Sequence, residues 1–365
     1  MPLLKILIIL VCIFLPFGEI LRFNLASNIF LKPLDLFSVL LFCWTIIVYI
    51  KNKELRKSLQ WFYFFFPIAG FFSLVINSYW LHSNELLTSF FYLLRWVSYL
   101  SIFFAVICVD EKFKKKIIKF LIVDGLILVL IGYIQFFFYP NLRNLYYLGW
   151  DEHLYRMFSS FLDPNFAGTF FVLYLIFISS VLFNKTKKLH KKELVFYMSL
   201  LGITLIAIFL TYSRSALVML IVSGITFFFL LQKKKFIFYL IGALLIFVII
   251  ISPYFYIENL DLFRINSSIS RFHSADNALS IIQKNPIIGV GFDSYRYAQL
   301  KYHLITLDPR FPSHSASGDD TSLLFVSATT GIIGLITYCY LWLQLFIKAK
   351  NISKKNIFGV VFIAS

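Results

Sequence analysis

The sequence predicts an all-α membrane protein: a polytopic bundle of about 10–12 transmembrane helices with one large, partly helical loop outside the membrane. Three observations support this prediction. Hydrophobic residues make up 60% of the 365 positions, and charged residues make up only 14%. That leaves too little polar surface to cover a water-soluble protein of this size. Long apolar runs also alternate with short clusters of basic residues.

Each transmembrane helix needs about 20 apolar residues, because the bilayer core is roughly 30 Å thick. Ten runs near this length lie at 3–18, 34–50, 61–80, 86–109, 117–139, 164–183, 194–212, 215–231, 236–252 and 320–347. An eleventh run begins at 357 and is too short to span, so it either lies in the membrane interface or is the start of a longer helix. The first run is interpreted as an uncleaved span, because Glu19 and Arg22 follow it directly without a clear cleavage site.

The formal net charge of +16 is explained by membrane topology. The connections 51–57, 110–119, 185–193, 233–235 and 348–355 each carry +3 or +4. The larger connections between them are neutral or carry a net charge of −1. By the positive-inside rule the basic connections and the N-terminus are cytoplasmic, and the other loops are external. The basic excess therefore requires no nucleic-acid partner.

This topology divides the chain into helices 1–9 (1–252), a large external loop (253–319), and helix 10 with the start of helix 11 (320–365). Within the loop, an amphipathic helix is predicted by helical spacing of its apolar residues and ends at Asn285-Pro286. The apolar face consists of Phe272, Ala275, Leu279 and Ile282. Gly289 and Gly291 then indicate a tight turn on the membrane surface rather than a phosphate-binding loop.

Polar residues at or inside the spans are the candidates for function. Arg214 lies between two apolar runs, where its guanidinium either reaches water or holds an anion. Arg95 and Asp124 lie inside predicted spans, and we expect them to pair across helices rather than to form an ion path. The four cysteines and six histidines show no metal-ligand spacing, so neither a metal nor a cofactor is predicted.

Four segments, in their order along the chain, carry a resemblance to a known family. They are Arg156 with Phe161-Leu162-Asp163-Pro164-Asn165-Phe166-Ala167, Thr211-Tyr212-Ser213-Arg214, Arg271 through Asn285-Pro286-Ile287-Ile288-Gly289-Val290-Gly291, and Gly331-Ile332-Ile333-Gly334. Together they resemble the bacterial O-antigen ligase and O-antigen polymerase superfamily. The resemblance implies a membrane glycosyltransferase that moves glycan from a polyprenyl (undecaprenyl) diphosphate carrier on the external face of the inner membrane, in surface polysaccharide assembly.

The resemblance also implies roles for individual residues. The planar guanidinium group of arginine can bind two phosphate oxygens of a diphosphate leaving group. Binding of the diphosphate is therefore assigned to Arg214, Arg156, Arg271 and Arg296. Ligases of the superfamily usually carry a His-Asn pair before the last glycine motif, where this chain has Asp320-Thr321. The candidates for the catalytic base are therefore His314, Asp320 and Asp319. Direct attack by a sugar hydroxyl would invert the anomeric configuration without a metal.

The sequence leaves several alternatives open. A ligase would transfer to a lipid A core, whereas a polymerase would extend the lipid-linked glycan, and the departure at Asp320 leaves both possible. The sugar, the linkage and the oligomeric state are not indicated. A transporter of a small anion or of a lipid-linked glycan is the alternative class, although no inverted repeat supports it.

Overall fold

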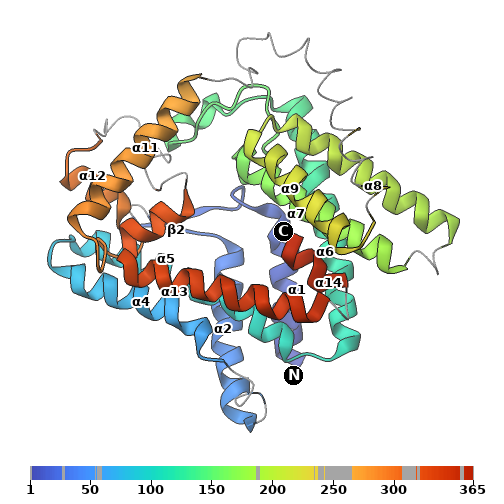
Figure 1. Ribbon diagram of the computed structural model, residues 1–365, viewed down its shortest axis with the longest axis horizontal. Coiled ribbons are helices and arrows are strands. Elements are labelled where there is room, and N and C mark those ends of the chain that lie inside the picture. The colour runs from blue at the N-terminus through green and yellow to red at the C-terminus, as the bar shows by residue number, and fades with distance from the viewer. Residues whose placement is uncertain are drawn as a thin grey trace. The chain divides into compact units, whose positions relative to one another are not determined.

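The computed structural model describes residues 2–26, 29–53, 55, 60–185, 190–233, 235–236, 242, 265–305, 318, 321–353 and 357–364. These residues are helical almost throughout, which confirms the all-α prediction (Figure 1). One antiparallel hairpin, β1 (Phe23–Ala26) with β2 (Ile29–Leu31), is the exception within the described ranges. Its two strands connect α1 (Pro2–Phe14) and the 3-10 turn η1 (Leu15–Phe17) to α2.

Seven described helices are long and apolar enough to cross a membrane. They are α2 (Pro33–Lys51), α4 (Phe62–Ile76) with the 3-10 turn η2 (Asn77–Tyr79), α5 (Ser83–Ile107), α6 (Glu111–Phe138), α7 (Pro164–Lys185), α8 (Lys191–Leu210) and α13 (Ser322–Ser353). Helix α1 and α9 (Arg214–Leu230) are shorter apolar helices. These nine helices match nine of the predicted runs, while the run 236–252 lies almost entirely outside the described residues.

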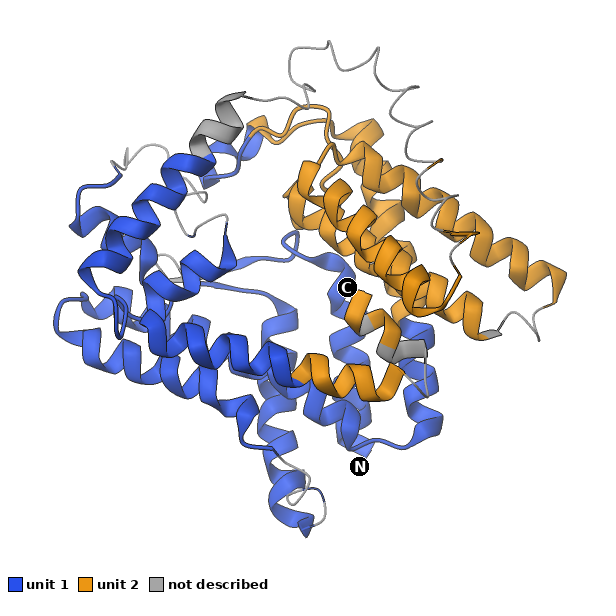
Figure 2. Cartoon of the chain, viewed as in Figure 1, with its two compact units in different colours: residues 1–120, 144–151, 265–344 blue, residues 121–143, 152–264, 345–365 orange. Residues whose placement is uncertain are grey.

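The chain forms two compact units (Figure 2). Unit 1 contains residues 1–120, 144–151 and 265–344, and unit 2 contains residues 121–143, 152–264 and 345–365. The remaining elements are the 3-10 turns η3 (Arg143–Leu148) and η4 (Ser159–Phe161), and the helices α11 (Ile265–Lys284), α12 (Tyr295–Lys301) and α14 (Ile357–Ala364). The described part of the predicted large loop therefore belongs to the same unit as the first four apolar helices.

A buried ionic network joins the first turn of α2 to the middle of α5 in unit 1. Asp35, which is 4% exposed, accepts hydrogen bonds from Arg95 Nη2 at 2.8 Å and from Tyr99 Oη at 2.5 Å. A second hydrogen bond joins Arg95 Nη2 to the carbonyl oxygen of Phe30 in β2 at 2.6 Å. Arg95 therefore has a different partner from the predicted Asp124. Sequence analysis did not single out Asp35, whose carboxylate the first turn of α2 brings to α5.

Helix α11 ends before Asn285-Pro286 as predicted, but it packs through a different face. Ala278 and Ile281 are fully buried against Val290, Tyr295, Ala298 and Ala328, in one core cluster with α12 and α13. Phe272, by contrast, is 78% exposed and Leu279 is 47% exposed. The predicted apolar face is therefore only partly packed: Ile282 contacts this cluster, whereas Phe272 and Leu279 are exposed. In a membrane protein the larger apolar side chains can face outward, while small residues allow close packing.

The glycines that follow α11 let its turn pack closely against α13. Gly331 has φ 66° and ψ −169° and divides α13 at a kink. A Cβ atom on Gly331 would lie 2.2 Å from the carbonyl oxygen of Ile287, and one on Gly289 would lie 2.5 Å from the carbonyl carbon of Thr329. The turn predicted at Gly289 and Gly291 is present, but it is packed inside unit 1, and these glycines are required because the two backbones touch.

Unit 2 is built around α7, which packs against α8, α9 and α14. Gly168 permits the close approach of α7 and α9, because a Cβ atom there would lie 2.6 Å from Ala216 Cβ. Near the other end of α7, Ile176 is buried with Phe227, Val360 and Ala364 in a core cluster. The N-termini of α7 and α9 therefore lie together, and the candidate site is found there.

Candidate functional site

The turn between α8 and α9 presents Arg214 at the first position of a helix. Ser213 is the N-cap residue, and its hydroxyl oxygen accepts a hydrogen bond from the backbone N–H of Ala216 at 3.3 Å. The Ser213 hydroxyl also donates to Asn165 Oδ1 in the first turn of α7 at 2.8 Å. Arg214 is half-buried and Ser215 is exposed. The N-terminus of α9 and the guanidinium of its first residue, Arg214, thus share one location, which favours an anion.

Arg156 holds this turn against the segment that precedes α7. Its side chain is buried, with 6% exposed. Nε donates to the carbonyl oxygen of Thr211 at 2.9 Å, and Nη2 donates to Asn165 Oδ1 at 3.3 Å and to the carbonyl oxygen of Tyr212 at 3.4 Å. Arg156 therefore joins the two segments that the sequence singled out, and three of its hydrogen bonds go to protein oxygens. A diphosphate contact by Arg156 stays a prediction.

Gln135, near the C-terminal end of α6, fixes the backbone beside Arg156. Its side-chain oxygen accepts from the backbone N–H groups of Phe158 at 2.8 Å and Ser159 at 3.1 Å, and its Nε2 donates to the carbonyl oxygen of Arg156 at 3.2 Å. Sequence analysis missed Gln135. The available signal was an uncharged polar residue at the end of an otherwise apolar run, where a buried amide needs partners.

Backbone strain is concentrated around the same site. Of eight described non-glycine residues with positive φ, five are His153, Tyr155, Ser159, Leu162 and Tyr212. Such conformations cost free energy and persist where the surrounding structure holds them, often at functional sites. Asp163 caps α7 by accepting from the N–H groups of Asn165 at 2.7 Å and Phe166 at 2.9 Å, as the sequence indicated.

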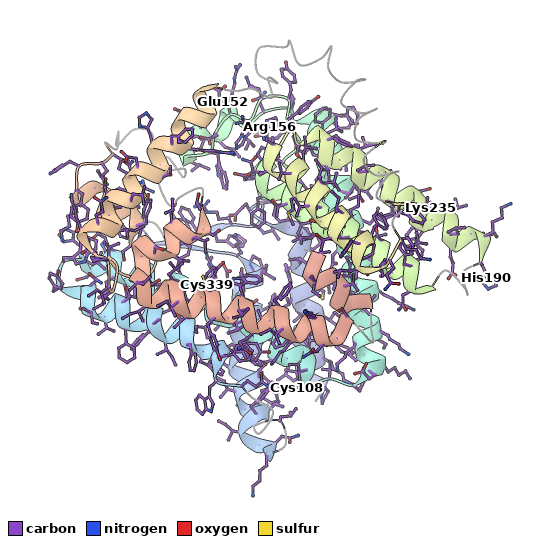
Figure 3. All side chains as sticks on the ribbon, viewed as in Figure 1. Cys108, Glu152, Arg156, His190, Lys235 and Cys339 are labelled. Carbon is purple, nitrogen blue, oxygen red and sulfur yellow. The ribbon has the colours of Figure 1, made fainter. Side chains whose placement is uncertain are left out.

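The site lies at one end of unit 2. Arg156 is at this end of the helices, and His190 and Lys235 lie toward the other end (Figure 3). That separation is what alternating cytoplasmic and external connections would produce. The sidedness of the membrane and the position of the N-terminus stay predictions.

A second polar site lies in unit 1, where the turn after α11 meets α4, α5 and α13. The Ser73 hydroxyl lies 2.7 Å from the carbonyl oxygen of Ile288 and 2.9 Å from that of Thr329. Asn77 Nδ2 donates to the carbonyl oxygen of Gly289 at 3.0 Å. These bonds fix the chain just before Asp293, which is half-buried and has φ 58°. Sequence analysis missed Asp293, although it follows the predicted glycine turn directly.

Of the other predicted site residues, two are described by the structure and three are not. Arg271 is exposed on α11 and Arg296 is half-buried on α12, both in unit 1. His314, Asp319 and Asp320 lie outside the described residues. Among the residues that the structure describes, no group of three or more His, Cys, Asp or Glu side chains is arranged to hold a metal ion.

Fold and sites together define a polytopic membrane protein with polar turns at the ends of its helices. Residues 199–339 match the sequence profile of a family described as O-antigen ligase. This match confirms the resemblance to the O-antigen ligase and polymerase superfamily, and it includes the Thr211–Arg214 turn, α11, the glycine turn and the kink of α13. Residues 25–145 match a family described as Lnb transmembrane domain. No curated protein matches the chain.

Proposed function

We propose that this protein transfers glycan from a polyprenyl diphosphate carrier to a hydroxyl acceptor at the external face of a bacterial inner membrane. One observation supports the proposal: the Thr211–Arg214 turn falls within the O-antigen ligase match and brings the guanidinium of Arg214 to the N-terminus of α9, where an anion is favoured. The substrates implied are a lipid-linked oligosaccharide and either a second such chain or a lipid A core.

Arg214 is the residue that we assign to the diphosphate. As the glycosidic bond to the carrier breaks, negative charge develops on the leaving phosphate oxygen. A fixed guanidinium and the N–H groups at the start of α9 would stabilise that charge without reorganisation. Arg156 is assigned a positioning role, because its hydrogen bonds to Thr211, Tyr212 and Asn165 set the direction of the turn. Arg271 and Arg296 remain candidates for contacts with the carrier or the glycan.

The acceptor hydroxyl must lose its proton as it attacks the anomeric carbon. Direct displacement would invert the anomeric configuration and needs no covalent enzyme intermediate or metal. His314, Asp319 and Asp320 are the candidates for the base from the resemblance. The acceptor distinguishes the two kinds of enzyme in the superfamily. A polymerase extends the carrier-linked chain, and a ligase transfers the glycan to a lipid A core.

The proposal is tested by reconstituting the protein in liposomes with a polyprenyl diphosphate oligosaccharide, first alone and then with a lipid A core acceptor. A ladder of lipid-linked repeats would indicate a polymerase, and transfer only after acceptor addition would indicate a ligase. Arg214→Ala should lower the rate by about 100-fold or more, as removal of a fixed oxyanion donor does. Arg143→Ala is the matched control, because Arg143 is an exposed arginine of the same unit.

Two results would contradict the proposal. Absence of product from folded wild-type protein under both conditions would refute glycan transfer and favour the transporter alternative. Normal product from Arg214→Ala would show that the anion site of the α8–α9 turn has no part in the reaction. Elution of each variant as a single peak in size-exclusion chromatography would show that lost activity does not reflect unfolding.

A further inference from the structure

The side-chain amide of Asn165 is held in one orientation by the two segments that meet at the site of unit 2. Its Oδ1 accepts from Arg156 Nη2 at 3.3 Å and from the Ser213 hydroxyl at 2.8 Å. Both lone pairs of this oxygen are then in use. A guanidinium has donors only, so reversing the amide would place two donors against each other. The position of Asn165 Nδ2 is therefore fixed as well.

The direction of each hydrogen bond in this network follows from the number of protons available. Ser213 has one hydroxyl proton, which lies between its oxygen and Asn165 Oδ1 because the amide oxygen carries none. Ser213 Oγ must therefore accept from the Ser215 hydroxyl at 2.9 Å, as well as from the Ala216 N–H at 3.3 Å. The hydroxyl protons of Ser213 and Ser215 are both used inside the network, and neither is left to donate to a ligand.

Asn165 Nδ2 is the donor that this network leaves over. Among the described residues, none accepts a hydrogen bond from it. The nitrogen is not enclosed by protein atoms, as Oδ2 of Asp124 is. Asn165 is half-buried and the neighbouring Phe166 is 61% exposed, so this end of α7 is open to its surroundings. A fixed polar group that has no partner in the protein is available to a ligand.

The charges around Asn165 favour a negatively charged acceptor. Asn165 lies in the first turn of α7 and binds Ser213, the N-cap of α9, so its amide lies at the positive ends of two helices. Asp163 Oδ1 already accepts from two backbone N–H groups of α7. Arg156 and Arg214 add two positive charges to the one negative charge of Asp163, which leaves a net charge of +1. An oxyanion is the ligand that complements this charge.

We propose that the side-chain amide of Asn165 donates a hydrogen bond to a phosphate oxygen of the diphosphate carrier, beside Arg214. The inference rests on the proposed function and deepens it, because it adds a neutral donor to the residues assigned to the carrier. Asn165 lies outside residues 199–339, the range of the O-antigen ligase match. Its amide is already in place when the leaving oxygen gains charge, so the hydrogen bond strengthens in the transition state without reorganisation.

The variant that tests this contact is Asn165→Asp, because it separates the two ends of the amide. The carboxylate keeps an oxygen that accepts from Arg156 and Ser213, but it replaces the N–H donor with a second, negatively charged oxygen. We expect a denaturation midpoint no lower than that of wild type, because the guanidinium and the start of α7 both favour a carboxylate. Asn141→Asp is the matched control: Asn141 lies in the same unit, and its Oδ1 accepts from the Arg143 N–H at 3.2 Å.

Two measurements are made on wild type and both variants. The first is the rate of transfer in the liposome assay, where Asn165→Asp should lower kcat/KM for the lipid-linked substrate by about 100-fold or more. The second is the Kd of inorganic pyrophosphate for the purified protein in detergent, measured by calorimetry. Asn165→Asp should raise this Kd by about tenfold or more, because a donor to a charged oxygen is lost. Asn141→Asp should match wild type in both measurements.

The outcomes separate this inference from the proposed function. Absence of product from folded wild-type protein would refute glycan transfer itself, and wild type that does not bind pyrophosphate would refute the anion site of the α8–α9 turn. Active wild type with a near-normal rate or an unchanged pyrophosphate Kd in Asn165→Asp would overturn only the contact from Asn165. Loss of activity together with a lowered denaturation midpoint in Asn165→Asp would overturn it too, because the amide would then serve the fold alone.

Discussion

The close contact between Gly331 and the turn after α11 predicts that Gly331→Ala destabilises unit 1. The alanine methyl group would lie 2.2 Å from the carbonyl oxygen of Ile287, although Cβ contacts under 3.0 Å essentially never occur. Because the obstacle is backbone, the turn itself has to move. The φ of 66° with ψ of −169° adds strain of about 1–3 kcal/mol for any residue with a side chain.

Displacing the turn also weakens the hydrogen bonds that attach it to α13. Val290 N–H donates to the carbonyl oxygen of Ala328 at 3.0 Å, Gly291 N–H to that of Thr329 at 2.9 Å, and Ile332 N–H to that of Pro286 at 2.9 Å. Each contributes about 0.5–1.5 kcal/mol. If two of the three are lost, the total destabilisation is about 2–6 kcal/mol.

The assay is denaturant unfolding of the purified protein in detergent, followed by circular dichroism and by the loss of the single size-exclusion peak. Gly202→Ala is the control, because Gly202 lies within α8 with no atom within 4 Å of an added Cβ. We expect Gly202→Ala to stabilise by up to about 1 kcal/mol through helix propensity. A Gly331→Ala variant within about 1 kcal/mol of wild type would refute the backbone contact.

Three further predictions concern the polar networks. Arg156→Lys should reduce transfer at least tenfold, measured in the liposome assay, because an ammonium cannot reproduce the guanidinium fork to Thr211 and Asn165; full activity would contradict its positioning role. Asp35→Ala should lower the free energy of unfolding by about 3 kcal/mol, because it leaves Arg95 without its carboxylate, and an unchanged denaturation midpoint would argue against this. Asp293→Asn should be more stable than wild type at pH 8. Burial raises the pKa of the Asp293 carboxyl to about 7. Folding therefore favours the protonated carboxyl, and wild-type stability falls as pH rises from about 4 to 7. A difference that does not shrink toward pH 4 would contradict the raised pKa.

The membrane spans could be predicted from sequence, because bilayer thickness sets the length of an apolar run and basic clusters separate the runs. The packed face of α11 could not. Apolar character identifies a buried face in water, but near a bilayer Phe272 and Ala278 are both acceptable neighbours of lipid, and close packing favours the smaller side chain. The prediction included Phe272 and Leu279, which are exposed, whereas the structure buries Ala278 and Ile281.

The candidate sites were predicted in part. Thr211–Arg214 and Arg156 were both singled out, but the bond between Arg156 and Thr211 joins positions 55 residues apart and depends on how α6, α7 and α8 pack. Sequence alone could not show which arginine would be anchored by protein oxygens. Asp293 was overlooked because its positive φ of 58° has no signature in residue type or spacing.

The approach of α7 and α9 at Gly168 has a thermodynamic consequence for the resting protein. Both helices begin at the same place, so the positive ends of two helix dipoles lie side by side, together with the guanidinium of Arg156. Like ends repel by about 0.3–1 kcal/mol, but the Asp163 carboxylate at the start of α7 offsets the charge of that end. The first turn of α9 contains no acidic residue. If an anion binds there, as the proposed function requires, it should raise the resistance of unit 2 to unfolding.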